Sequence, residues 1–289
     1  MAFEEHRQRL FSLAYRMLGS AVDAEDVVQA AWLKLSGVSD VRDEAALLTT
    51  ITTRLCLDEL RSARRAREAY VGPWLPEPVL SSDLGPLETA EQRESVSLGA
   101  VVLLERLNPA ERAVCVLRDA FGYPYAEIAR VLDRTEAGCR QLHRRARQRL
   151  ADETVRFDVA TEDHRALTEQ LFTAAALGDL AGLESMLADE VILVSDGGGK
   201  VQAARRPVRG ASDVARFLIG IAAKLEPGLE IAAVEVNGVP SLLLLRDGAV
   251  HSVSQVLRSG GRVHRVLIVM APDKLARLSR PGVLSRQEA

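Results

Sequence analysis

The chain has 289 residues, a formal net charge of −3 and 47% hydrophobic residues. This length allows two or three compact domains, and the composition is that of a globular, largely helical protein. The longest uninterrupted apolar run, Leu242 to Leu245, is far shorter than the roughly 20 residues that a membrane span needs. Because the N-terminus also lacks the apolar core of a secretory signal, we expect a cytoplasmic protein with no membrane partner.

The first helical domain is predicted over residues 1–70. Its first apolar stripe has helical spacing and consists of Leu10, Phe11, Ala14, Met17 and Leu18. The segment "DAEDVVQAAWLKL" predicts a second helix capped by Asp23, with Glu25 and Asp26 in its positive first turn. A longer helix is expected from about Asp43, and it becomes strongly basic at its end.

Residues 71–97 have a different character. They contain four prolines and five acidic residues against a single arginine. Such a segment cannot continue a helix before Pro86, so we predict an extended acidic linker.

A second helical domain is predicted over residues 98–155, and it contains a helix-turn-helix. Asn108 is placed to cap a helix that continues through "NPAERAVCVLRDAF". A short helix then ends at Asp133, which can adopt a left-handed conformation, and Thr135 caps the following helix. The buried face of that helix is expected to consist of Cys139, Leu142, Ala146 and Leu150.

The opposite face of that last helix is rich in arginine and glutamine. The outward-facing side chains are expected to be Arg140, Gln141, Arg144, Arg145, Arg147 and Gln148. Arginine and glutamine can pair with guanine and adenine edges in the major groove, and further arginines can bind phosphates. An arginine-rich, solvated helix end is the alternative interpretation.

A second basic helix ends the first domain. It carries Arg54, Arg61, Arg64, Arg65 and Arg67. By itself this helix is more typical of a charged solvated face than of a nucleic-acid contact.

The third unit, residues 160–289, changes from helical to strand periodicity. A helical segment is followed by one further helix at 212–225 and by short apolar or alternating runs, which predicts an α+β domain. Strands are expected at 191–196, 200–206, 230–236, 240–248, 249–257 and 262–270.

Three cysteines, Cys56, Cys115 and Cys139, lie far apart and lack a CxxC pattern or histidine-rich neighbours. An odd, scattered set predicts buried thiols in a reducing compartment rather than disulfides or zinc ligands. We expect no metal site and no cofactor.

Taken together, these segments resemble bacterial RNA polymerase sigma factors of the small, extracytoplasmic-function (ECF) type. "DAEDVVQAAWLKL" resembles the polymerase-binding helix of region 2, and "LLTTITTRLCLDELRSARRARE" its promoter-melting and −10 segment. "LNPAERAVCVLRDAFGYPYAEIARVLDRTEAGCRQLHRRARQRL" resembles region 4, which reads the −35 element.

The resemblance implies a function and a set of partners. It implies a sigma factor that directs core RNA polymerase to promoters and binds the β′ clamp helices and the β flap. The loop from Ser36 to Ala45 is then expected to capture an unstacked −10 base. The implied polymerase contacts are Asp23, Glu25, Asp26, Gln29 and Trp32. The implied −10 contacts are Arg54, Arg61, Arg64 and Arg65, and the implied −35 contacts are Thr135, Arg140, Gln141, Arg144, Arg145 and Arg147.

The near-zero net charge of residues 1–150 fits a factor that binds DNA together with polymerase. Residues 1–150 contain 21 Lys/Arg and 22 Asp/Glu. A near-neutral carrier should bind free DNA poorly, because non-specific affinity depends on the number of phosphates neutralised. A sigma factor does not need such affinity when polymerase supplies it.

The third unit is similar to the SnoaL-like (NTF2-like) cone, which one sigma-J-type subgroup of ECF factors carries. The motifs of this likeness are "WLPEP" (Trp74–Pro78), "DGGGK" (Asp196–Lys200) and "NGVPSLLLLRDG" (Asn237–Gly248). The subgroup implies that the extension regulates the attached sigma domains through intramolecular contact. We expect the regulatory residues to be Trp74, Leu75, Pro76, Asp196, Gly197, Gly198, Gly199 and Lys200.

Other interpretations of the third unit stay open. "DGGGK" is not a phosphate-binding P-loop, because Val201 follows the lysine, and a hairpin turn between two strands is the better prediction. An enzymatic cone would be lined by side chains such as Asp196, Arg209, His251 and His264, although no acid–base pair stands out. A small-molecule ligand in the cone, or a DNA-binding regulator that acts without polymerase, are the remaining alternatives.

Overall fold

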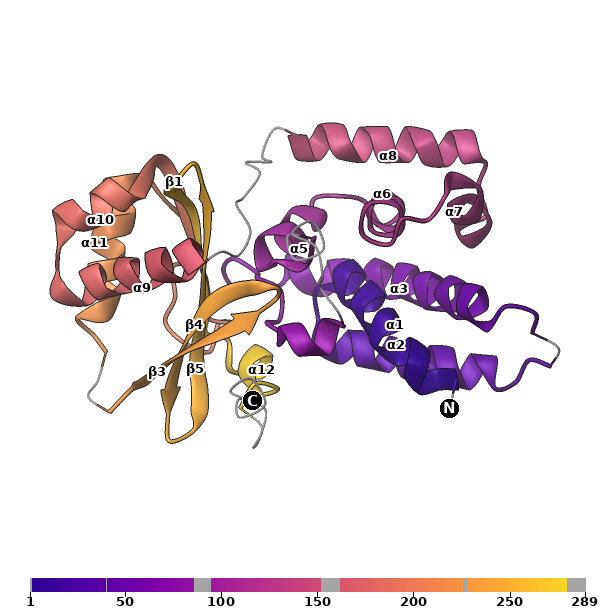
Figure 1. Ribbon diagram of the computed structural model, residues 1–289, viewed down its shortest axis with the longest axis horizontal. Coiled ribbons are helices and arrows are strands. Elements are labelled where there is room, and N and C mark those ends of the chain that lie inside the picture. The colour runs from indigo at the N-terminus through magenta and orange to yellow at the C-terminus, as the bar shows by residue number, and fades with distance from the viewer. Residues whose placement is uncertain (1, 40, 86–94, 152–161, 226–227, 280–289) are drawn as a thin grey trace. The chain divides into compact units, whose positions relative to one another are not determined.

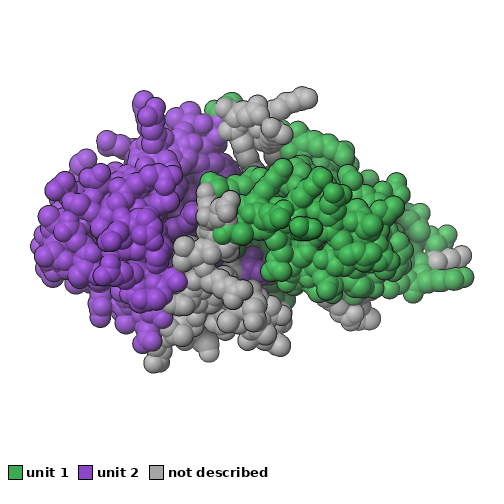
Figure 2. Space-filling view, turned by 90° about the horizontal axis from the view of Figure 1, so that it is seen from above, with its two compact units in different colours: residues 1–69, 82–87, 100–154 green, residues 70–81, 88–99, 155–289 purple. Residues whose placement is uncertain are grey.

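The computed structural model describes residues 2–39, 41–85, 95–151, 162–225 and 228–279. It divides the chain into two compact units, which Figure 2 colours separately. Unit 1 comprises residues 1–69, 82–87 and 100–154, and unit 2 comprises residues 70–81, 88–99 and 155–289. The first part of the expected linker, residues 71–81, therefore packs as part of unit 2.

Three helices form the first half of unit 1: α1 (Ala2–Leu18), α2 (Ala21–Leu35) and α3 (Glu44–Glu68) (Figure 1). The predicted stripe of α1 is buried, as its helical spacing requires. The prediction that Asp23 caps α2 is wrong. Ser20 is the cap, because its hydroxyl accepts a hydrogen bond from the Asp23 amide at 3.2 Å.

The second half of unit 1 is also helical. Its elements are α5 (Leu98–Leu104), whose first two residues belong to unit 2, α6 (Pro109–Cys115), the π-helical turn η2 (Val116–Ala120), α7 (Tyr125–Leu132) and α8 (Glu136–Ala151). Asn108 caps α6 as predicted, in a reciprocal capping box with Glu111. The expected single helix through Phe121 instead changes to π-helical hydrogen bonding at Val116, a local insertion that is frequent at functional sites.

The two halves of unit 1 pack together, with α3 against α6 and α7. Arg112 on α6 is buried and donates a hydrogen bond to the Met17 carbonyl at 2.7 Å. Arg54 on α3 donates through Nε to the Val131 carbonyl of α7 at 3.2 Å. These contacts hold the first three helices and the helix-turn-helix in one body.

Unit 2 is built on a sheet whose described strands have the order β2-β1-β6-β5-β4-β3. The strands are β1 (Leu187–Asp196), β2 (Val208–Arg209), β3 (Glu230–Val236), β4 (Val239–Arg246), β5 (Ala249–Ser259) and β6 (Arg262–Val269). Neighbouring strands are antiparallel except β1 and β6, which are parallel.

Helices complete unit 2. Helices α9 (Glu162–Leu177), α10 (Leu180–Met186) and α11 (Ala211–Ala222) lie together on one side of the sheet (Figure 1). Their apolar faces and the facing side chains of β1, β5 and β6 form its main hydrophobic core. Helix α12 (Pro272–Leu275) follows β6, and the 3₁₀ turn η1 (Ser81–Leu84) lies in the segment expected to be a linker.

The strand predicted at 200–206 is absent from the structure, which has irregular backbone there. Gly197 to Lys200 instead form a tight turn, in which the Lys200 amide donates to the Gly197 carbonyl at 3.0 Å. The Ala204 amide then donates to the Ser195 hydroxyl at 2.9 Å, which replaces a ladder hydrogen bond. Pairing with β1 resumes only in the two residues of β2, so the glycines do not join two full strands.

None of the helices in the described part of the chain is long and apolar enough to span a bilayer.

Candidate functional sites

The helix-turn-helix has the local geometry that its sequence predicts. Asp133 ends α7 in the left-handed region, with φ of 52° and ψ of 55°. The Thr135 hydroxyl accepts from the Gly138 amide at 3.1 Å and so caps α8. Cys139 and Ala146 are buried, which fixes the face that α8 turns toward the rest of unit 1.

The face of α8 that was predicted to read DNA is exposed. It carries Arg140, Gln141, Arg144, Arg145 and Arg147, and Thr135 is exposed at the start of the helix. Arg140 also pairs with Glu136 at 3.1 Å and stacks over the Tyr125 ring, so its guanidinium is already oriented.

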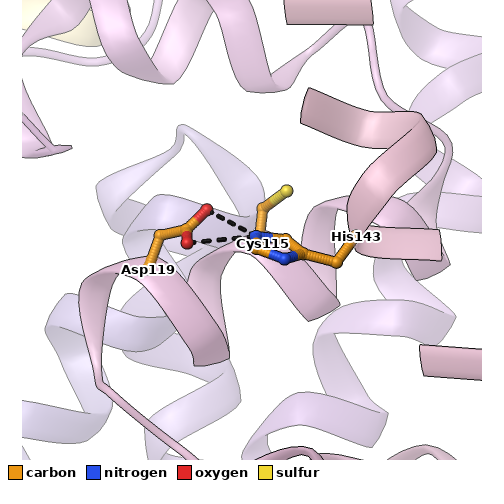
Figure 3. A group of neighbouring side chains, drawn as sticks. All are labelled: Cys115, Asp119 and His143. Atoms are coloured by element: carbon orange, nitrogen blue, oxygen red, sulfur yellow. Dashed lines mark hydrogen bonds and ion pairs between the residues drawn. The ribbon is translucent and has the colours of Figure 1, made fainter. Parts of the chain in front are cut away.

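A buried histidine that the sequence analysis missed anchors α8. His143 lies four residues after Cys139 and three before Ala146, so helical spacing alone places it on the buried face. Its Nε2 lies 2.9 Å from a carboxylate oxygen of Asp119 on η2, and its Nδ1 lies 2.8 Å from the Tyr125 hydroxyl on α7. Figure 3 shows the two Asp119 contacts.

Cys115 stands next to this pair, and its sulfur lies within 4.8 Å of the His143 and Asp119 ligand atoms (Figure 3). Two observations oppose a metal ion there. Burial raises the pKa of the Cys115 thiol to about 12, so the thiol would resist becoming the thiolate that metals bind. Several arginines, among them Arg118, Arg144 and Arg147, line the adjacent cavity and disfavour a dication. We therefore assign the cluster to the positioning of α8.

The basic helix α3 presents part of its predicted set to solvent. Arg54 and Arg61 are exposed, and Arg61 pairs with Asp58 at 2.8 Å. Arg64 and Arg65 lie on the helix, but their side chains fall outside the described part of the structure.

The surface of α2 combines acidic and apolar side chains. Asp26 and Gln29 are exposed, whereas Asp23, Glu25 and Trp32 are half-buried. Val22 and Leu33, which the sequence analysis did not single out, are 56% and 72% exposed. They share one helical stripe with Asp26 and Gln29, and exposed apolar side chains on such a stripe are typical of a docking face.

The segment between α3 and α5 is held by Asp196 of unit 2. This fully buried carboxylate accepts hydrogen bonds from the Tyr70 hydroxyl at 2.7 Å and the Leu75 amide at 2.8 Å. The Gly198 amide donates at 2.9 Å, and Lys274 of α12 forms an ion pair at 2.6 Å. Burial, together with the hydrogen bond to Asp196, raises the pKa of Tyr70.

Lys274 adds contacts of its own to the same segment. Its ammonium donates to the Leu75 carbonyl and lies 4.8 Å and 4.4 Å from the ring centroids of Tyr70 and Trp74. Both rings can therefore stabilise the cation through their faces.

Two further polar side chains bind the segment along its length. Asn237 accepts from the Val79 amide at 3.1 Å and donates to the Val96 carbonyl at 2.9 Å. Gln255 accepts from the Leu98 amide at 3.1 Å. Both side chains are fully buried. We call Asp196, Asn237, Gln255 and Lys274 the linker clasp.

Steric contacts explain why glycines occupy the middle of "DGGGK". A Cβ on Gly198 would lie 3.0 Å from the Ala271 Cβ, and one on Gly199 would lie 3.0 Å from the Val71 Cβ. Both residues also have positive φ, of 63° and 71°, which favours glycine. Lys200, in contrast, faces solvent and pairs with Asp273.

A cavity of about 650 Å³ opens into unit 2 between the helices and the sheet. It is lined mainly by apolar side chains of α9, α11, β4 and β5, with His251 and Arg246 among the polar ones. Of the four side chains considered for an enzymatic cone, His251 lines this cavity, whereas Asp196, Arg209 and His264 do not. No aspartate or glutamate occurs among its described lining residues, so an acid–base pair is missing there.

Comparison with known families defines the class of the protein. The model for sigma-70 region 2 matches residues 2–66, and the model for sigma-70 region 4 matches residues 100–150. These are the helical bundle of α1–α3 and the helix-turn-helix, so the chain is a sigma factor of the sigma-70 type.

Relatives narrow the class. The ECF RNA polymerase sigma factor SigJ of Mycobacterium tuberculosis is 42% identical over 78% of this chain and 74% of its own length. The probable ECF sigma factor SigI of the same species is 32% identical over 95% of this chain and 93% of its own. The crystal structure of M. tuberculosis SigJ superposes with a TM-score of 0.78 and 35% identity, over 97% of this chain and 98% of that one.

The chain belongs to the ECF RNA polymerase sigma factors. It is a transcription initiation factor that directs RNA polymerase to promoters, and it is not an enzyme. Its fold class is the expected one in its two helical sigma regions and its C-terminal α+β domain.

Proposed function

We propose that this sigma factor is regulated by its own unit 2, which binds the linker between region 2 and region 4. The observation that carries the proposal is the buried carboxylate of Asp196, which accepts hydrogen bonds from both Tyr70 and Leu75. Hydrogen bonds to a charged acceptor in a buried site are among the stronger ones in proteins. The clasp therefore restrains the linker.

The restraint matters because of distance. The −10 and −35 elements are roughly 25 base pairs, or about 85 Å, apart at ~3.4 Å per base pair. The chain between Glu68 and Leu98 can extend to roughly 100 Å at ~3.3–3.6 Å per residue. While residues 70–80 and 96–98 are bound to unit 2, that reach is unavailable.

A contact within unit 1 also keeps the proposed −10 and −35 readers close together. Arg54, a proposed −10 contact, donates to the Val131 carbonyl of region 4. Since the two readers are adjacent in this arrangement, they must separate before both promoter elements can be bound at once. We propose that the described arrangement is the resting state.

We place the partner contacts on three helices, α2 and α3 of region 2 and α8 of region 4. On α8 and its cap, the proposed −35 contacts are Thr135, Arg140, Gln141, Arg144, Arg145 and Arg147. On α3, the proposed −10 contacts are Arg54, Arg61, Arg64 and Arg65. For the β′ clamp helices, α2 offers Asp23, Glu25, Asp26, Gln29 and Trp32, and we add Val22 and Leu33 because of their exposure. Region 4 would bind the β flap.

The cavity supports a further element of the proposal, a small-molecule ligand in the cone. Its volume of about 650 Å³ lies in the range that ligand pockets occupy.

The test is run-off transcription with core RNA polymerase. Asp196→Asn places an amide NH₂ among groups that all donate, so it should weaken the clasp and increase the transcript several-fold. Asp189→Asn is the matched control, because Asp189 lies on the same strand and its side chain is 95% exposed. Equal transcripts from the wild type and both variants, with all three folded by circular dichroism, would contradict the proposal.

A further inference from the structure

The cavity and the linker clasp share structural elements. Leu275 lines the cavity, and the preceding residue Lys274 binds Asp196 and Leu75. Met270 also lines the cavity, and its amide donates to the Asp196 carbonyl at 2.7 Å. Val201 lines the cavity directly after "DGGGK". One wall of the cavity is therefore continuous with the residues that hold the linker.

The cavity exposes apolar surface that the fold itself does not cover. Ile231, Leu225 and Val201 line it and are 66%, 43% and 40% exposed. Leu242 and Leu244 turn their side chains from β4 into the same space and are only half-buried. Large apolar side chains that are left exposed around a concavity of this size are typical of a ligand site.

The polar lining indicates what one end of the ligand must carry. Arg246 ends β4 opposite Ala249, and His251 follows two residues later on the adjacent strand. Both can donate hydrogen bonds, and the guanidinium matches a carboxylate in charge and geometry. Among the described lining residues the charged side chains are those of Lys224 and Arg246, and none of the described ones is acidic, which favours an anionic head group.

From this arrangement we infer that the cavity binds an amphipathic carboxylate, with an apolar body between α11 and β4 and its head group at Arg246 and His251. We further infer that binding tightens the linker clasp. The inference deepens the proposed function and rests on it.

The direction of the effect follows from linkage. The cavity wall is complete when Leu275 and Met270 are in place, which is the state in which the neighbouring Lys274 and Asp196 hold the linker. A ligand that packs against this wall binds the clasped state better than a state in which α12 has moved. By reciprocity, the ligand binds the unclasped state more weakly by the same factor by which it favours the clasped one. A variant that populates the unclasped state therefore lowers the ligand's apparent affinity.

Laurate is a suitable probe, because it combines a carboxylate with a flexible apolar chain. For a ligand of about 14 non-hydrogen atoms we expect a Kd on the order of 10–100 μM by calorimetry. Dodecanol, which lacks the charge, should bind the full-length chain at least five-fold more weakly. Leu244→Trp, which fills the cavity, should abolish laurate binding, and Arg246→Met should remove the preference for laurate over dodecanol.

The coupling is tested with the clasp variant in the absence of polymerase. Asp196→Asn should weaken laurate binding five-fold or more, whereas the control Asp189→Asn should leave the Kd unchanged. Equal laurate affinity in wild type and Asp196→Asn, equal affinity in wild type and Leu244→Trp, or no binding up to 1 mM would each overturn the inference.

Transcription separates this inference from the proposal on which it rests. Laurate should lower the run-off transcript of the wild type and leave that of Leu244→Trp unchanged. If Asp196→Asn raises the transcript but its laurate affinity is that of the wild type, the inference fails while the proposed regulation stands. If Asp196→Asn and Asp189→Asn give equal transcripts, the proposed regulation itself fails.

Discussion

At the scale of single residues, the chemistry of position 196 explains why an acidic side chain is buried there. Four donors converge on it: one hydroxyl, two backbone amides and one ammonium. A carboxylate is an acceptor at both oxygens, so it satisfies them all. An asparagine of the same size would direct its own two N–H groups at donors, and leucine would remove the ion pair with Lys274.

The buried thiols should make the free energy of unfolding fall as the pH rises. Burial raises the pKa of Cys115 from its ordinary value of 9.0 to about 12, and it raises the pKa of the fully buried Cys56 as well. The protonated thiols are favoured in the folded chain, so their contribution to stability is full below pH 9. It is lost as the pH rises from 9 through 12, because unfolding then releases a proton.

We therefore expect the free energy of unfolding to fall by up to about 1.4 kcal/mol per pH unit for each of these thiols above pH 9. Urea denaturation at pH 8 and pH 10 measures the slope. In Cys115→Ala the free energy of unfolding should fall less steeply with pH than in the wild type over this interval. An unchanged slope would argue against the raised pKa of Cys115.

At the scale of elements, backbone geometry and close approach decide what the turn after β1 can contain. Gly198 and Gly199 occupy the two central positions of the turn with positive φ, and the linker and α12 lie directly against them. Neither condition by itself requires two glycines, since asparagine tolerates positive φ, as Asn237 does with φ of 53°. Both conditions together exclude a side chain.

Gly199→Ala should therefore lower the free energy of unfolding by roughly 1–3 kcal/mol, through backbone strain and contact with Val71. Gly220→Ala is the matched control with the opposite expected sign. Gly220 lies within α11 with no atom within 4 Å of an added Cβ, so alanine should stabilise by roughly 0.5–1 kcal/mol. Thermal unfolding measures both, and equal effects would refute the steric explanation.

The features that were predicted correctly from the sequence are those formed by residues close together in the chain. Asn108, Asp133 and Thr135 were predicted correctly in their capping and turn roles, because those roles depend on neighbours within four residues. The strand predicted at 200–206 was wrong, because a hydrogen bond from the Ala204 amide to the Ser195 hydroxyl replaces the ladder there. The π-helical turn at Val116 has no periodic signal, yet it is the element that carries Asp119 to His143.

At the scale of the whole molecule, net charge limits how strongly the chain by itself can bind DNA. The chain has a net charge of −3, while the arginines of α8 form a local basic face. A body of this charge gains little from counter-ion release on DNA, so affinity must come largely from the polymerase to which the sigma factor is bound. The basic face then contributes a small number of phosphate contacts.

The salt dependence of promoter binding by the holoenzyme tests this division. Arg144→Ala and Arg145→Ala should each reduce the slope of log K against log salt concentration by about 1 if the side chain contacts a phosphate. Arg165→Ala is the control, because Arg165 lies on α9 and pairs with Glu169 at the surface of unit 2. Fluorescence anisotropy between 50 and 200 mM KCl measures the slope for each variant. If the slopes of Arg144→Ala and Arg145→Ala equal that of the control, these side chains do not contact phosphates.

The sequence by itself determined the family, the two helical sigma regions and the α+β character of the last domain. These follow from helical and strand periodicity and from the order of motifs along the chain, all of which are local. The sequence also placed Leu75 and Asp196 among the expected regulatory residues. The tertiary structure alone decided that residues 70–81 belong to unit 2 and that the Asp196 carboxylate accepts hydrogen bonds from Tyr70 and Leu75. Tyr70 and Leu75 are 126 and 121 residues away from Asp196 in the chain. Hydrogen bonds over such separations leave no periodic pattern, because they depend on where folding brings the two segments together.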